Sequence, residues 1–132
     1  GQALTKFKQN IEVQGGNAAV CDDPELLVDP TLLRVPVGAA ASGYVAAVNT
    51  FAVGRAICDI GGGRIKAEDG VDHAVGLECT VKIGDKVEPG DPLGIIYCRT
   101  QAQADSISEI LQNAYKITEE IPDIPKLIRA TV

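Results

Sequence analysis

A chain of 132 residues is long enough for one domain whose single hydrophobic core needs no disulfide or metal for stability. Hydrophobic residues make up 45% and charged residues 23%, which indicates a globular fold rather than a disordered chain. The formal net charge of −6 leaves no excess of Lys and Arg for a phosphate backbone, and no apolar run reaches the roughly 20 residues of a bilayer span. Neither nucleic acid nor a membrane is therefore an expected partner, and without a recognisable signal sequence we expect a cytoplasmic location.

The first 31 residues contain one predicted helix and a linker. Apolar residues recur at helical spacing over residues 2–13, and Gly15 and Gly16 are placed to end the helix. Because the helix begins without an N-cap signal and the chain starts at Gly1 rather than Met, we expect residues 1–16 to belong to, or pack on, an upstream α/β domain. Residues 17–31 are rich in Asp and Pro and are predicted to form a linker.

Residues 32–132 are predicted to form an α+β domain. Alternating apolar residues predict strands around residues 33–37 and 44–48, joined by a turn or bulge, and further strands over residues 75–83 and 93–98. A short helix over residues 51–59, with Thr50 as its N-cap, and a longer amphipathic helix over residues 101–118 are expected to flank the strands. The Pro-punctuated tail, residues 121–132, is predicted to be an extended edge segment.

The segment VKIGDKVEPGDPLGII, residues 81–96, has the pattern of a tight β hairpin. Gly84 and Gly90 supply backbone angles closed to other residues, and apolar residues are expected to point inward, namely Val87, Leu93 and Ile95. Such hairpins are typical of barrel-sandwich domains, so the predicted fold is a barrel-sandwich-like set of antiparallel hairpins flanked by helices. Biotinyl and lipoyl carriers use this pattern, but they need a Lys at an exposed hairpin tip. The stretch after this hairpin has none, and the nearest are Lys82 and Lys86.

A glycine-rich loop, residues 61–70, follows the predicted short helix and carries the candidate site residues, namely Gly61, Gly62, Gly63, Arg64 and Lys66. Three glycines followed by cations can cradle an anion through backbone N–H groups, with Arg64 as a phosphate clamp. The loop lacks the spacing of a phosphate loop or a dinucleotide fold. A structural interpretation stays open beside it, in which the glycines permit a tight turn and Arg64 pairs with Glu68 or Asp69.

The other candidate residues do not form a catalytic or metal-binding motif. His73 stands in a strand-like run without a neighbouring Ser, Cys or carboxylate of a known catalytic pattern, so we expect it to be packed or hydrogen-bonded as a structural residue. Four widely spread cysteines, without a CxxC pair or a His cluster, are typical of free buried thiols in a reducing compartment, namely Cys21, Cys58, Cys79 and Cys98. No catalytic residue, metal or cofactor is expected in this chain.

The order of several motifs resembles the carboxy-terminal part of the pyrimidine nucleoside phosphorylases, and of the thymidine phosphorylases among them. These motifs are KFKQNIEVQGG (residues 6–16), SGYV (42–45), VGRAICDIGGGR (53–64), EDGVDHAVGLE (68–78) and GDKVEPGDPLGIIY (84–97). The resemblance covers nearly the whole chain and is weakest over residues 17–41. The sequence departs from it in a third glycine before Arg64 and in His73.

The resemblance implies an enzyme that cleaves a pyrimidine nucleoside with inorganic phosphate, giving the free base and a pentose 1-phosphate. It also implies a homodimer whose upstream domains hold both substrates, while this α+β domain aids folding and domain closure. Residues 61–70 are then expected to lie near the interdomain cleft, with Arg64 making the contact. Two alternatives stay open: a non-catalytic binding or scaffold module, and a biotinyl- or lipoyl-type carrier.

Overall fold

The computed structural model describes residues 1–126 and 128, which fall into two compact units, Gly1–Thr31 and Leu32–Val132. The first unit contains α1 (Gln2–Val13) and two 3-10 turns, η1 (Ala18–Cys21) and η2 (Pro24–Leu27). The predicted helix over residues 2–13 is confirmed, and the chain turns after it at Gly15, whose φ is 81°. No residue of α1 is buried, and Phe7 is 60% exposed. The apolar side chains of α1 are therefore accessible for packing on another protein surface.

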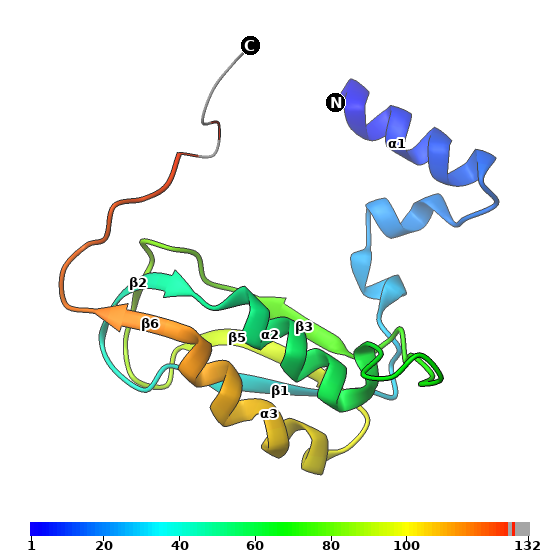
Figure 1. Cartoon of the computed structure of the whole chain (residues 1–132). Coiled ribbons are helices and arrows are strands. Elements are labelled where there is room, and N and C mark those ends of the chain that lie inside the picture. Colours follow the sequence, from blue (N-terminus) through cyan, green and yellow to red (C-terminus); the bar gives the residue numbers. More distant parts are fainter. Residues whose placement is uncertain (127, 129–132) are drawn as a thin grey trace. The chain divides into compact units, whose positions relative to one another are not determined.

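The second unit consists of two open antiparallel sheets with two helices, so the α+β fold class is confirmed (Figure 1). One sheet has the strand order β1-β5-β3 and the other has the order β4-β2-β6. Helices α2 and α3 pack against each other. The bounds are β1 (Leu33–Gly38), β2 (Gly43–Val48), α2 (Thr50–Ile57), η3 (Cys58–Gly62), β3 (Gly76–Cys79), β4 (Lys86–Val87), β5 (Pro92–Cys98), α3 (Gln101–Ala114) and β6 (Tyr115–Thr118).

The two predicted helices of this unit exist but differ at their ends. Helix α2 is capped by Asn49 rather than by Thr50, since the Asn49 side chain accepts a hydrogen bond of 3.1 Å from the backbone N–H of Ala52. Its last turn widens into the π turn η3. Helix α3 ends at Ala114, so the prediction of a helix up to residue 118 is wrong. Tyr115 to Thr118 instead pair with β2 as an edge strand.

The strands form close to the predicted positions, but some of them pair with other strands than predicted. Strands β1 and β2 follow each other in the chain but belong to different sheets. The tight hairpin predicted over residues 81–96 is also wrong, because β4 pairs with β2 whereas β5 pairs with β1 and β3. Only residues 76–79 of the predicted strand 75–83 are extended in a sheet. In the tail, residues 121–126 and 128 lie outside any strand, and the rest of that prediction falls outside the described residues.

The glycine geometry of that segment is confirmed, since Gly84 and Gly90 have φ values of 98° and 90°. Val87 and Leu93 are buried as predicted, but Ile95 is only half-buried, and Ile96 takes the interior position. The reason is the register of β5: Ile96 lies opposite Val35 of β1 and Leu77 of β3, inside the sheet that α2 and α3 pack against. Leu93 faces a different cluster, together with Val45 and Val87.

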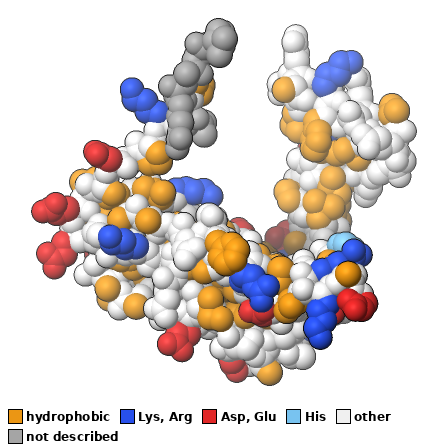
Figure 2. Space-filling model, in the orientation of Figure 1, with side chains coloured by type: hydrophobic (Ala, Val, Ile, Leu, Met, Phe, Trp, Pro, Cys, Tyr) orange, Lys and Arg blue, Asp and Glu red, His pale blue; other side chains and the backbone are white. Residues whose placement is uncertain are grey.

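Two hydrophobic clusters stabilise the second unit. The larger one joins β1 and β5 to the helices through fully buried side chains that include Ile96, Ile107 and Leu111. The smaller one joins the sheet of β2, β4 and β6 to the start of β5. On the face shown in Figure 2, charged side chains of both signs alternate with apolar ones. No helix among the described residues combines the length and apolarity of a membrane span.

Candidate functional site

The glycine-rich loop follows α2 within the second unit (Figure 1). Its first two glycines are the last residues of η3, and Gly63 comes directly after them. Gly61 has a φ of 97°, which disfavours a side chain. A Cβ on Gly62 would come within 2.5 Å of Ile57 Cγ2, and one on Gly63 would overlap Cys58 Sγ. The glycines therefore permit close packing against the preceding turn, as the structural interpretation predicts.

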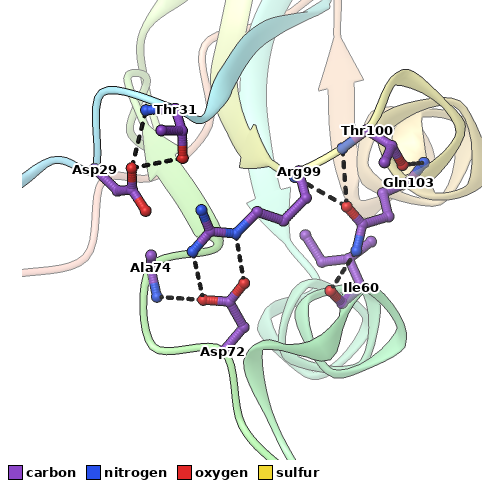
Figure 3. A network of polar contacts seen from close by, with 8 residues as sticks. All are labelled: Asp29, Thr31, Ile60, Asp72, Ala74, Arg99, Thr100 and Gln103. Atoms are coloured by element: carbon purple, nitrogen blue, oxygen red, sulfur yellow. Dashed lines mark hydrogen bonds and ion pairs between the residues drawn. The ribbon is translucent and has the colours of Figure 1, made fainter.

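The two ends of the loop are tied together at its base. The backbone N–H of Asp72 donates to the carbonyl of Gly61 at 2.9 Å. The Asp72 carboxylate accepts two hydrogen bonds from the Arg99 guanidinium, at 2.7 Å from Nε and 3.1 Å from Nη2 (Figure 3). It also accepts the backbone N–H of Ala74 at 3.1 Å. Both side chains of this bidentate ion pair are about one-third exposed. The pair fixes the base of the loop to the residue that follows β5.

Gln103 links the start of α3 to the middle of η3. Its Oε1 accepts the backbone N–H groups of Arg99 and Thr100 at 2.9 and 3.1 Å, and its Nε2 donates to the carbonyl of Ile60 at 2.9 Å (Figure 3). Thr100 Oγ1 in turn accepts the backbone N–H of Gln103 at 3.2 Å, which completes a capping box. The Gln103 side chain thus accepts backbone N–H groups at the start of α3 and also holds η3, the segment that leads into the glycines.

We expect Thr100→Ala to lower the free energy of unfolding by about 0.5–2 kcal/mol, because an orphan N–H of α3 loses its acceptor. Urea denaturation followed by circular dichroism measures the change. Gln101→Ala is the matched control on the next residue, which is exposed, and is expected to stay within about 0.5 kcal/mol. Equal losses in the two variants would show that the cap contributes nothing.

Beyond this base, hydrogen bonds from the loop backbone to the Asp69 side chain order the loop. Asp69 Oδ2 accepts the N–H groups of Ile65 and Lys66 at 3.0 and 2.8 Å. Asp69 is therefore engaged by the backbone rather than by Arg64, and the N–H groups of Ile65 and Lys66 are occupied by a carboxylate of the chain itself. The side chains of Arg64 and Lys66 are exposed, and Ile65 between them is 53% exposed. The exposed side chains of the loop thus include two cations, the carboxylate of Glu68 and one large apolar group, on a fixed base.

The remaining candidates are dispersed. His73 was predicted to be packed or hydrogen-bonded as a structural residue. It is exposed in a turn between Asp72 and Val75, so the packed alternative is wrong. All four cysteines are free, but only Cys98 is buried, while Cys79 is exposed. Within the described residues, His, Cys, Asp and Glu side chains do not gather in groups of three that could hold a metal ion.

A family model described as the pyrimidine nucleoside phosphorylase C-terminal domain matches residues 44–118. The chain belongs to this family. The match runs from β2 to the last residue of β6, so it includes the loop, its Asp72–Arg99 base and the Gln103 contacts.

Curated relatives of this pyrimidine nucleoside phosphorylase C-terminal domain carry the name thymidine phosphorylase. The protein from Burkholderia cenocepacia is 37% identical over 124 residues, covering 92% of this chain and 28% of the relative. Those from Burkholderia orbicola and Sinorhizobium medicae are each 35% identical, covering 98% and 92% of this chain. The chain thus spans about 28% to 30% of the length of these relatives.

Proposed function

We propose that this domain is part of a thymidine or pyrimidine nucleoside phosphorylase, which converts a nucleoside and inorganic phosphate into the free base and a pentose 1-phosphate. The observation that carries the proposal is the match of residues 44–118 to the C-terminal domain family, together with relatives named thymidine phosphorylase. In this proposal the domain supplies no catalytic residue, metal or cofactor. It works in the cytoplasm within a homodimer, and its partners are the upstream domains that bind nucleoside and phosphate.

The loop of residues 61–70 is proposed to contact those upstream domains when they close over the substrates. Its anchored base and exposed Ile65 support this role, because an apolar side chain on a fixed base is stabilised when it packs on a protein surface. Arg64 and Lys66 on either side of it can pair with carboxylates of that surface. Closure matters for phosphorolysis because it excludes water from the reacting groups. The exposed apolar stripe of α1 supports the companion proposal that residues 1–16 pack on an upstream α/β domain, with residues 17–31 as the linker to residues 32–132.

Arg64→Ala in the full-length phosphorylase is expected to lower kcat/KM by about two- to fivefold, the loss of one cross-domain charge contact. The free energy of unfolding is expected to stay within about 0.5 kcal/mol, since Arg64 is exposed. Base release measured by chromatography gives the rate. Trypsin cleavage after Lys66, a site that the unaltered chain and Arg64→Ala share, is followed with and without nucleoside plus phosphate and reports whether closure protects the loop.

Lys116→Ala removes an equally exposed cation from β6, away from the loop, and is expected to leave both readouts unchanged. If Arg64→Ala behaves like this control in both turnover and protease protection, the loop has no part in closure.

A further inference from the structure

A second feature of the domain lies away from the glycine-rich loop. A cavity of about 490 Å³ opens beside the sheet of β4, β2 and β6, and aliphatic side chains form most of its wall, including Val48, Val81 and Ile83. Figure 2 shows apolar side chains gathered where the chain leaves this sheet after β6. Cavities of this size, mostly apolar with a few polar groups, are typical of small-molecule sites.

The polar group that marks this cavity is the side chain of Tyr115, at the first position of β6. Tyr115 lines the cavity and is only 6% exposed, yet its hydroxyl has no hydrogen-bond partner within the described residues. Burial raises the pKa of Tyr115, and a side-chain hydrogen-bonding interaction with the Cys79 thiol, which lines the same cavity, raises it further. The hydroxyl therefore stays protonated and can donate. The thiol is only a weak hydrogen-bond partner and does not meet hydrogen-bond geometry, so a ligand oxygen or nitrogen would bind the hydroxyl better.

A buried hydroxyl without a good hydrogen-bond partner is unfavourable, so such groups are rare unless a ligand or water completes them. The residues that line the cavity indicate which kind of ligand can bind the Tyr115 hydroxyl. Lys82 lies at the cavity but is exposed, so its charge stays solvated, and the interior is aliphatic. An apolar ring fits that interior, and a carbonyl oxygen or ring nitrogen on it accepts a hydrogen bond from the Tyr115 hydroxyl.

We propose that this cavity binds an uncharged, mostly apolar molecule of one or two rings, held by a hydrogen bond from the Tyr115 hydroxyl to an acceptor on the ligand. The site is distinct from the glycine-rich loop and does not depend on the phosphorolysis proposed above. Cys79, exposed at the wall, is a natural reporter of its occupancy.

The test compares two probes of nearly equal shape, 1-indanone, which has a carbonyl, and indane, which does not. Each is titrated into the whole chain while backbone amide resonances are followed by NMR. We expect 1-indanone to shift resonances around Val48, Val81 and Tyr115 and to bind about fivefold more tightly than indane, the contribution of one hydrogen bond. It should also slow the alkylation of Cys79 by a maleimide.

Tyr115→Phe removes the donor while keeping the ring, and is expected to abolish the preference for 1-indanone. Val81→Phe, which fills the cavity, should weaken both probes. Shifts scattered outside the cavity, equal binding of the two probes by the unaltered chain, or an unchanged preference in Tyr115→Phe would each overturn the proposal. The comparison in the unaltered chain and the Cys79 readout remain decisive even if a variant fails to fold.

Discussion

Leu111→Ala is expected to lower the free energy of unfolding by about 2–5 kcal/mol, enough to unfold a marginally stable domain. Leu111 is fully buried in the cluster that joins α3 to β1 and β5. The variant loses the free energy of transferring the removed carbon atoms out of water. It also loses the van der Waals contacts around the cavity that the truncation leaves. Urea denaturation of the whole chain, followed by circular dichroism, measures the loss.

Ile110→Ala is the matched control, because Ile110 precedes Leu111 on the same helix and is 41% exposed. Its loss is expected to be below about 1 kcal/mol, since less apolar area is buried there. Similar losses at both positions would contradict the packing of α3 described above.

Gly43→Ala is expected to destabilise the domain by about 2–5 kcal/mol through a backbone clash in the sheet of β4, β2 and β6. Gly43 has a φ of 148°, and a Cβ there would overlap the carbonyl oxygen of Thr118 and come within 2.8 Å of Ile117 Cγ2. Because the first obstacle is backbone rather than a flexible side chain, β6 would have to move away from β2. Urea denaturation gives the loss, and amide exchange of residues 115–118 reports the separation.

The control is Gly54→Ala, in the middle of α2, where an added Cβ meets nothing within 4 Å. Alanine has a higher helix propensity than glycine, so the free energy of unfolding of this variant is expected to rise by about 0.5–1 kcal/mol. A loss in the control, or no loss in Gly43→Ala, would be inconsistent with the register of β2 and β6.

The sequence predicts the helices and the antiparallel strands because local patterns suffice for both. It fails at Tyr115 to Thr118, where the apolar positions of α3 continue at helical spacing through Ile117. The strand forms because β2, about 70 residues earlier, offers a partner, and no local pattern reports such a pairing. The same limit explains the wrong hairpin: glycines specify the turns around residues 84 and 90, but not which sheet each flanking strand joins.

The candidate site was predictable to a similar extent. Three consecutive glycines indicate the tight turn, and Thr100 followed three residues later by Gln103 is a capping-box pattern that could have been recognised. The ion pair between Asp72 and Arg99 joins residues 27 positions apart and carries no local signal. Tyr115 was predicted to lie in a helix rather than at the start of β6, so the sequence did not predict the cavity that it lines.

The most direct test of the account is phosphorolysis by the 132-residue chain on its own, incubated with thymidine and inorganic phosphate and assayed chromatographically for free thymine. We predict no release above a protein-free blank, because the substrate-binding groups are proposed to lie in upstream domains. Phosphate-dependent release that grows in proportion to the concentration of this chain would contradict the account.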